Sequence, residues 1–378
     1  MCDGLLHVSL GEIVSFEYGS ALPTGLRTGS EYPVFGSSGI IGYHSVPDVD
    51  GPAIIIGRKG TVGSVYWSQQ PCWPIDTTYW VKPTRELDVR WLYWMLQTLG
   101  LEGMGSSTGI PGLNRNDAYR ATVRVPPLPK QRRTAEILDG VDNQIRSQER
   151  TIAKLELGKR GFLDHELNKL GKGEWIPTKR LLAHVIDFRG RTPRKLGMNW
   201  GDGTILALSA NNVQMGTIDT SRETYYGSER LYSAWMTHGP TRRGDIVVTM
   251  EAPLGNIARI PDDRKYILSQ RVVLLRFDEK YLVNNFAYWF MRSSSFQREI
   301  AARSTGTTAT GIRRATLEAI PMPVPAMSVQ GKIASGVFSF QDRIDRETTV
   351  WTKLTVQKQA LMDDLLTGRV RVPVGGGV

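Results

Sequence analysis

The chain has 378 residues, of which 40% are hydrophobic and 22% charged, so it is expected to fold into two or three globular domains and is not a disordered chain. Two cysteines are too few for a disulfide scaffold or a Cys-rich zinc cluster, and they fit a reducing compartment. The net charge of +10 favours a polyanionic partner, nucleic acid above all.

The N-terminus lacks the basic start and apolar core of a signal peptide. No apolar run approaches the roughly 18 residues that a membrane span requires. We therefore expect a cytoplasmic protein without a membrane segment.

Residues 1–124 form the first globular segment, which is rich in glycine, serine, threonine and aromatic residues. Short β-like runs predict strands at 53–56, 65–67 and 79–81. A helical stretch at 89–99 and a small-residue loop at 103–118 follow. The segment has 9 basic and 11 acidic residues, a net charge of −2.

A long helix is predicted next, within residues 125–170. It begins after the proline-rich stop VPPLP (125–129) and ends before Gly171 and Gly173. Its apolar residues recur in 3-4-7-3-7 steps, which is a heptad seam. The seam consists of Leu138, Val141, Ile145, Ile152, Leu155 and Phe162.

The second globular segment, residues 171–323, repeats the order of the first. Strands are predicted at 205–208, 245–249, 256–260 and 272–277, followed by a helical stretch at 282–299 and a small-residue loop at 302–316. This segment has 22 basic and 14 acidic residues, a net charge of +8. We expect it to make more phosphate contacts than the first segment.

A second long helix is predicted within residues 324–368, between the stop PMPVP (321–325) and Gly368. Gly331 and Gly336 are poor helix formers near its start. Its apolar seam has the same steps as the first and consists of Val337, Phe340, Ile344, Trp351, Leu354 and Leu361.

The two halves align at an offset of 199 residues, which indicates an internal duplication. Identical pairs include Gln131/Gln330 and Lys154/Lys353. Lys159 and Lys358 interrupt the two seams at the same position. Each seam must be buried, and the simplest arrangement is an antiparallel coiled coil of the two helices. The alternative is that each helix lies on its own domain.

The sequence lacks the short motifs of common catalytic sites. There is no P-loop, and the glycines of GRKGTVG (57–63) have the wrong spacing for a dinucleotide site. The five histidines are scattered. Asp263 and Lys265 in PDDRK (261–265) have a spacing seen in nuclease metal sites, but the segment is more typical of a polar turn. A self-contained nuclease remains an alternative.

Several segments together carry a family resemblance. They are VPPLPKQRRTAEILDGVD (125–142) with its weaker echo at 324–345, RKGTVGSVYW (58–67) with PIDTTYWV (74–81), RGRTPR (189–194) and LSANNVQMGTI (208–218). On these segments the whole chain resembles the specificity (S) subunit of type I restriction–modification enzymes.

The resemblance implies an α+β fold with pseudo-two-fold symmetry. Its implied parts are target recognition domain 1 (1–124), a central spacer helix (125–170), target recognition domain 2 (171–323), a distal spacer helix (324–368) and a C-terminal tail (369–378). Each domain would read one half of a bipartite, asymmetric site in double-stranded DNA. The helices would set the spacing and dock two methylation subunits, which a restriction subunit would join. We expect the seam residues to take part in docking, because one partner helix cannot fully cover the seam. Charge substitution at Ile145 together with Ile344 should then abolish docking. No cofactor is expected in this chain, because S-adenosylmethionine, ATP and magnesium would be bound by the partner subunits.

Base reading requires side chains with defined donors and acceptors, and these gather in the predicted loops. In the first domain the candidates are Ser37, Ser38, Arg58, Lys59, Thr77, Thr78, Thr108, Asn114 and Arg115. In the second domain they are Arg191, Arg194, Asn211, Asn212, Gln214, Gln270, Arg271, Thr307, Thr308, Arg313 and Arg314. No catalytic or metal-ligating residue is predicted. A scaffold that binds DNA without regard to sequence is the other alternative.

Overall fold

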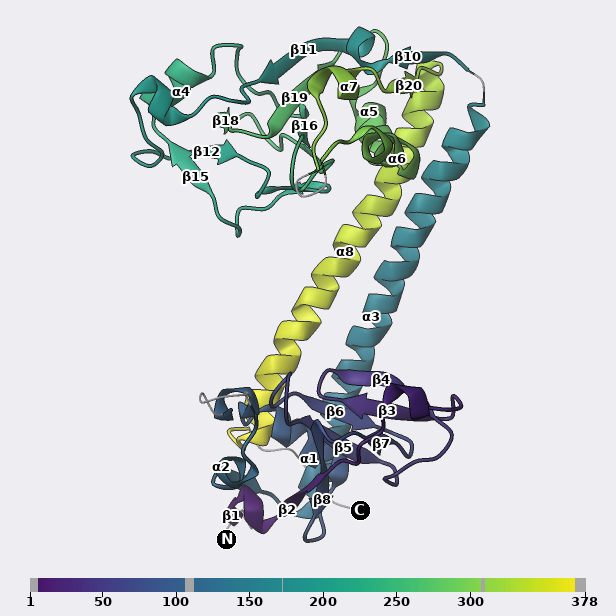
Figure 1. Ribbon diagram of the computed structural model, residues 1–378, viewed down its shortest axis with the longest axis vertical. Coiled ribbons are helices and arrows are strands. Elements are labelled where there is room, and N and C mark those ends of the chain that lie inside the picture. The colour runs from purple at the N-terminus through teal and green to yellow at the C-terminus, as the bar shows by residue number, and fades with distance from the viewer. Residues whose placement is uncertain (1–5, 106–111, 172, 307–309, 371–378) are drawn as a thin grey trace, which may run out of the picture. The chain divides into compact units, whose positions relative to one another are not determined.

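The computed structural model describes residues 6–105, 112–171, 173–306 and 310–370 of the chain. The chain forms two compact units. The first comprises residues 1–150 and 348–378, and the second comprises residues 151–347. Each unit contains one β-rich domain and part of both long helices, α3 (Leu128–Lys169) and α8 (Met327–Leu366) (Figure 1). Across the described ranges, no helix is both long and apolar enough to cross a membrane.

Three small sheets build the β-rich domain of the first unit. Their strand orders are β2-β8-β5-β6, β4-β3-β7 and β1-β9. The strands are β1 (Leu6–Ser9), β2 (Val14–Tyr18), β3 (Tyr32–Gly36), β4 (Gly39–His44), β5 (Ala53–Gly57), β6 (Val65–Ser68), β7 (Trp73–Pro74), β8 (Thr78–Pro83) and β9 (Thr122–Val125). The apolar run of β5 is buried along its whole length, because β8 and β6 flank it.

The described residues of this domain also contain the α-helices α1 (Val89–Gln97) and α2 (Arg115–Tyr119). The side chain of Asp88 caps α1 by accepting a hydrogen bond from the Trp91 amide at 2.8 Å. Trp91 and Trp94 are fully buried and pack with the first turns of α3 and the last turns of α8 in one apolar core.

The second unit has four sheets, with strand orders β11-β19-β16-β17, β15-β12-β18, β10-β20 and β13-β14. The strands are β10 (Trp175–Pro177), β11 (Leu182–Asp187), β12 (Ile205–Leu208), β13 (Val213–Gln214), β14 (Thr217–Ile218), β15 (Tyr225–Gly227), β16 (Ile246–Thr249), β17 (Ile257–Arg259), β18 (Tyr266–Leu268), β19 (Val272–Phe277) and β20 (Pro321–Pro323).

The helices of this domain are α4 (Glu229–Trp235), α5 (Asn284–Met291), α6 (Ser294–Arg303) and α7 (Arg314–Glu318). The single helical stretch predicted at 282–299 is therefore wrong, since it is divided between α5 and α6. The division falls at Ser293, whose hydroxyl accepts a hydrogen bond from the Phe296 amide and so caps α6.

The duplication extends to strand topology. The sheet β2-β8-β5-β6 corresponds to β11-β19-β16-β17, and β4-β3-β7 corresponds to β15-β12-β18. In both three-stranded sheets one pair is antiparallel and the other parallel. The two domains differ in one connection. Ser37 and Ser38 alone join β3 to β4, whereas the segment joining β12 to β15 is long enough to contain the hairpin β13-β14.

Helices α3 and α8 pack antiparallel within each unit (Figure 1). In the first unit Lys358 contacts Asp142, and the Trp351 indole donates to Glu149 at 3.1 Å. In the second unit the rings of Phe162 and Phe340 lie 5.9 Å apart. The α8 residue number falls as its α3 partner's number rises, as antiparallel packing requires.

The predicted seam is covered by the chain itself. None of its twelve residues is exposed, and Leu138, Ile145, Val337 and Ile344 are buried. Gly336 is a poor helix former, but the packing of the two helices requires glycine there, because a Cβ would lie 2.4 Å from the Phe162 ring. Gly171 and Gly368 adopt φ values of +55° and +71° just beyond the helix ends, as predicted for helix stops.

Candidate DNA-binding surfaces

In the first domain, three loops that carry predicted DNA-contacting residues meet at one place. The amides of Arg58 and Lys59 both donate to the Thr77 carbonyl, at 2.9 and 3.1 Å. The hydroxyl of Ser37 lies 3.0 Å from the point where a Cβ on Gly60 would stand. The turn after β3, the loop after β5 and the loop before β8 therefore form one surface.

The segment before α2 joins this surface. The Leu113 amide donates to the Arg58 carbonyl at 2.8 Å. Asn114 follows, and its side chain is occupied in capping α2, where it accepts from the Asn116 amide at 2.9 Å. Thr108 lies outside the described residues.

The sequence did not single out Tyr18, which contacts the same surface. This residue is 51% exposed, and the guanidinium groups of Arg58 and Arg115 each lie over its ring, 5.0 Å from the ring centroid. Such stacking holds two cations in fixed positions. Two fixed arginines beside an exposed aromatic ring suit phosphate contact. An aromatic residue at the end of a strand, near arginine-bearing loops, was the signal available in the sequence.

The loops of the second domain follow the same backbone pattern. The Met250 amide donates to the Arg271 carbonyl at 2.8 Å, as the Arg58 amide does to Thr77, and the Ile312 amide donates to the Met250 carbonyl at 3.0 Å. Arg271 thus occupies the place of Thr77. Its φ of +67° is uncommon outside glycine.

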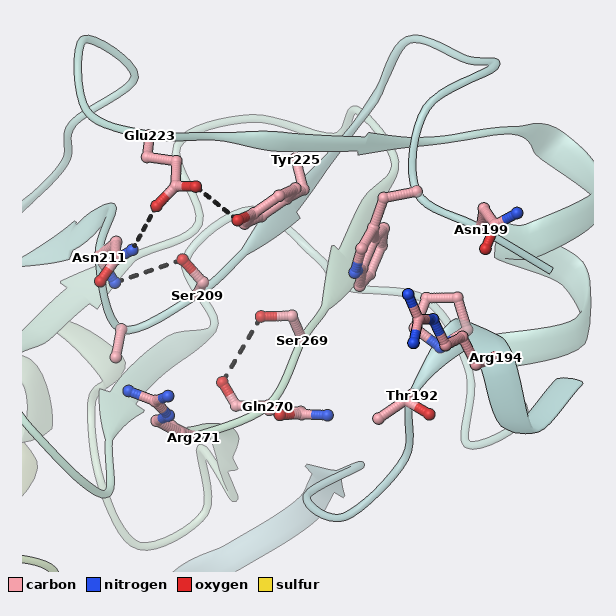
Figure 2. Close-up of a pocket in the computed structure, with 13 residues that line it drawn as sticks. Thr192, Arg194, Asn199, Ser209, Asn211, Glu223, Tyr225, Ser269, Gln270 and Arg271 are labelled. Atoms are coloured by element: carbon pink, nitrogen blue, oxygen red, sulfur yellow. Dashed lines mark hydrogen bonds between the residues drawn. The ribbon is translucent and has the colours of Figure 1, made fainter.

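A polar hollow of about 690 Å³ opens among these loops. Four predicted residues line it: Arg194, Asn211, Gln270 and Arg271. Figure 2 shows further lining residues that the sequence had not suggested, Thr192, Asn199, Ser209, Glu223 and Tyr225. Glu223 belongs to the segment that the first domain replaces with a two-residue turn, and Tyr225 is the first residue of β15, which follows that segment.

Several other predicted residues have internal partners. Thr78 and Asn212 are wholly buried, where Thr78 donates to the Ile75 carbonyl at 2.7 Å and Asn212 to the Ala207 carbonyl at 3.0 Å. Both stabilise the fold, and we remove them from the set of candidate DNA contacts. Arg191 donates to the Trp235 carbonyl at 2.8 Å and stacks on Phe188.

Arg313 and Arg314 do not line the hollow. Arg314 pairs with Glu318 at 2.7 Å, and it lies 3.9 Å from Asp187, which also pairs with Arg189. Burial alone would raise the pKa of Asp187, but the hydrogen bonds and charge of Arg189, with the charge of Arg314, outweigh it and lower that pKa. Thr307 and Thr308 lie outside the described residues.

The nuclease alternative receives no support from the local geometry. Lys265 is paired with Glu229 at 2.7 Å, and the Asp263 carboxylate accepts from the Arg243 amide at 3.3 Å. Within the part of the chain that the structure describes, no three His, Cys, Asp or Glu side chains are grouped closely enough to hold a metal ion.

Comparisons with known proteins agree with this architecture. The family model of the type I restriction modification DNA specificity domain matches twice, at residues 6–157 and 183–355. The MjaVIII specificity subunit of a Methanocaldococcus jannaschii type I restriction enzyme is 24% identical over 340 residues, covering 84% of this chain and 76% of that protein. The EcoprrI specificity subunit of Escherichia coli is 30% identical over 112 residues, covering 29% and 28%.

A solved structure has the same fold. The crystal structure of a type I restriction–modification S subunit from M. genitalium aligns with a TM-score of 0.64 and 14% identity, covering 97% of this chain and 96% of that one. With two matched domains that include most of its residues, the chain belongs to the type I restriction–modification DNA specificity family, as a specificity subunit with two DNA-recognition domains.

Proposed function

We propose that each β-rich domain reads one half of a bipartite, asymmetric site in duplex DNA, and that the chain catalyses no reaction itself. The observation that supports this most directly is the shared strand order combined with different loops. At corresponding places the first domain has the turn Ser37–Ser38 and the second has a segment with its own hairpin. One scaffold with two sets of loops is suited to read two different sequences.

The paired helices are proposed to set the spacing between the halves. With 42 and 40 residues, α3 and α8 are each about 60 Å long at 1.5 Å per residue. Half-sites one helical turn apart are about 34–36 Å from centre to centre. Inserting one heptad into each helix at facing positions should lengthen the non-specific spacer of the recognised site and leave both halves unchanged.

The helices are also proposed to dock two methylation subunits, which a restriction subunit would join. The seam is unsuited to docking because the chain covers it, so Ile145 and Ile344 are poor positions for a test. Large apolar side chains remain exposed elsewhere on the helices, among them Leu157 (64%), Phe338 (58%) and Val356 (65%). Leu157→Glu with Val356→Glu should reduce co-purification with the methylation subunit. Gln144→Glu, also at an exposed α3 position, should not.

S-adenosylmethionine is proposed to bind the methylation subunits, and ATP and magnesium the restriction subunit. The second domain's net charge of +8 and the first domain's stacked arginines support DNA contact by this chain. The chain's contribution to the complex would then be sequence recognition.

Methylome sequencing tests the proposal. A host carrying the methylation subunit is compared with and without the gene for this chain. A gene-dependent, bipartite methyladenine motif supports the proposal and identifies the site. If the purified complex instead binds all duplexes with equal affinity, the sequence-independent scaffold is correct. Cleavage of DNA by the chain alone with magnesium, removed by Asp263→Ala, would establish the nuclease.

A further inference from the structure

The polar hollow of the second domain contains a carboxylate, which is unexpected on a surface proposed to contact DNA. Glu223 lies in the hollow with Arg194 and Arg271 (Figure 2). A carboxylate repels phosphate, and it accepts hydrogen bonds but donates none when ionised. Near DNA it is favourable only where it meets a donor, and the donors on base edges are amino groups.

Glu223 is held in one orientation. The Tyr225 hydroxyl donates to its Oε1 at 2.5 Å, and the Asn211 amide nitrogen donates to its Oε2 at 3.3 Å (Figure 2). The Tyr225 ring lies in turn 6.1 Å from the ring of Trp200, which packs 5.6 Å from the buried Trp235. Each carboxylate oxygen has a second lone pair, so the group is oriented and can still accept from a ligand.

The position of Glu223 in the chain is that of a specificity element. It follows the β13-β14 hairpin and precedes β15, within the segment that distinguishes the second domain from the first. The strands around it share the common topology. A change here can therefore alter recognition without altering the scaffold.

The hydrogen-bonding groups on the base edges determine which base a carboxylate can recognise. In the major groove the cytosine edge offers the N4 amino donor without a neighbouring acceptor, whereas adenine places the N7 acceptor beside its N6 donor. A carboxylate would be repelled by N7, so it suits cytosine better. The paired guanine offers O6 and N7, which suit an arginine.

We propose that Glu223 accepts a hydrogen bond from the N4 amino group of a cytosine in the half-site read by the second domain, with Tyr225 and Asn211 positioning the carboxylate. This assignment rests on the proposed function and extends it to one base pair. The arginines of the hollow are then available to the guanine of the same pair or to its phosphates.

The experiment is methylome sequencing of hosts that carry the methylation subunit with the wild-type chain, Glu223→Ala, Tyr225→Phe or Glu229→Gln. Glu229 is an exposed carboxylate on α4, paired with Lys265 outside the hollow, and is the matched control. Circular dichroism and co-purification establish that each variant is folded and assembled.

The expected wild-type motif contains an invariant C·G pair in one half. Glu223→Ala should lower discrimination at that pair by about 10- to 100-fold, the value of one good side-chain–base contact. Tyr225→Phe should lower it less, at the same pair, and Glu229→Gln should leave the motif unchanged. All other positions should keep their selectivity in every variant.

The proposal is overturned if assembled Glu223→Ala retains the wild-type motif, or loses methylation equally at all sites. It is also overturned if the motif has no invariant C·G pair in either half. Absence of any gene-dependent motif with the wild-type chain is a different result, which contradicts the proposed function itself.

Discussion

Lys358 on α8 donates a hydrogen bond to Asp142 on α3 at 2.5 Å, and the pair is related by the internal repeat to Lys159 and Gln341, 2.8 Å apart. The two lysines interrupt the two apolar seams at equivalent positions of the repeat. The first unit places a charged acceptor, only 8% exposed, opposite its lysine, and the second places a neutral amide there. The duplicated contact is therefore an ion pair in one copy and a hydrogen bond in the other.

This difference predicts unequal effects of removing the two lysines. Lys358→Met leaves Asp142 buried with Arg146 alone, which should destabilise the first unit by about 2 kcal/mol. Lys159→Met leaves the neutral amide of Gln341 and the solvent-exposed carboxylate of Glu156, which Lys159 contacts at 2.7 Å, and should cost about 1 kcal/mol. Hydrogen exchange of α3 amides near each lysine, in the full chain, measures both. Adding Asp142→Asn to Lys358→Met should recover stability; a further loss would contradict the argument.

The same pair predicts a pH dependence. Burial raises the pKa of Asp142, but the hydrogen bonds from Lys358 and Arg146, together with their charges, outweigh it and lower that pKa below its ordinary value. The stabilisation is thus complete above the unfolded-state pKa of about 3.9 and is lost as the pH falls through the lower folded-state value. Urea titrations of wild type and Asp142→Asn should differ most near neutral pH and converge only below pH of about 4. A difference that grows in acid would show the opposite sign of shift.

Much of the fold could be predicted because it depends on periodicity and repetition. The heptad seams, the glycine stops and the strands β5, β12 and β19 are local patterns of apolar residues that the structure retains. The break at Ser293 falls in the polar run Arg292–Ser295 between the apolar residues of α5 and Phe296 of α6, and the Ser293 hydroxyl that caps α6 marks the boundary.

The candidate site was less predictable, since it depends on which loops meet. Asn212 has a side chain of the type that reads bases, but its side-chain amide is buried and donates its hydrogen bond to the Ala207 carbonyl. Glu223 was overlooked because acidic residues are disfavoured near phosphate, and its orientation depends on Tyr225, which only the folded segment brings to it. Residue type indicated the chemistry, whereas tertiary contacts decide which side chains remain available.

One identical pair of the repeat has an equally clear structural role. Gln131 accepts from the Asp88 amide at 2.8 Å and donates to the Pro126 carbonyl at 2.8 Å. Gln330 accepts from the Val283 amide at 2.7 Å and donates to the carbonyls of Pro325 and Tyr281 at 2.8 and 2.9 Å. Each buried glutamine thus joins the start of a long helix to the N-cap residue of an earlier helix of the same domain, α1 for Gln131 and α5 for Gln330.

Replacing either glutamine by leucine should leave two or more partly buried backbone groups without these partners. We expect a loss of about 2–4 kcal/mol in the unfolding free energy of the affected unit. Exposed Gln144→Leu is the matched control and should change stability by less than about 0.5 kcal/mol. If the unfolding free energy changed equally on substitution of Gln131, Gln330 and Gln144, the two buried glutamines would have no special structural role.

The arginines that flank Tyr18 predict a salt-dependent reduction of DNA affinity on their replacement. If Arg58 and Arg115 bind phosphates, replacing each by glutamine should weaken binding by the assembled complex at every sequence alike. The slope of log K against log salt should fall by about 1 for each phosphate that is no longer neutralised. Fluorescence anisotropy over a series of salt concentrations measures the slope. The control is Arg120→Gln, which replaces an exposed arginine that follows α2 and pairs with Asp117. A change in sequence preference with unchanged slope would indicate base contact instead.

The two domains place a stacked guanidinium group on different elements. In the first domain Arg90, the second residue of α1, stacks on Trp67 of β6 at 4.6 Å. At the corresponding places the second domain has Arg259 on β17 and Asn285 on α5, which are hydrogen bonded. The guanidinium group therefore comes from the helix in the first domain and from the strand in the second. If only one of the two positions is exchanged for its counterpart in the other domain, the site contains either two guanidinium groups or none.

Trp67→Arg alone should bring two guanidinium groups together, with loss of the stacking, and destabilise the first unit by about 2 kcal/mol. Trp67→Arg with Arg90→Asn gives the arginine and the asparagine the places that they have in the second domain. It should be more stable than Trp67→Arg, although it also breaks the ion pair of Arg90 with Asp139 at 2.7 Å. A double-mutant cycle on the unfolding free energy should give a favourable coupling of about 1 kcal/mol. Simple additivity would mean that the two positions do not interact and that the exchange between the domains arose without compensation.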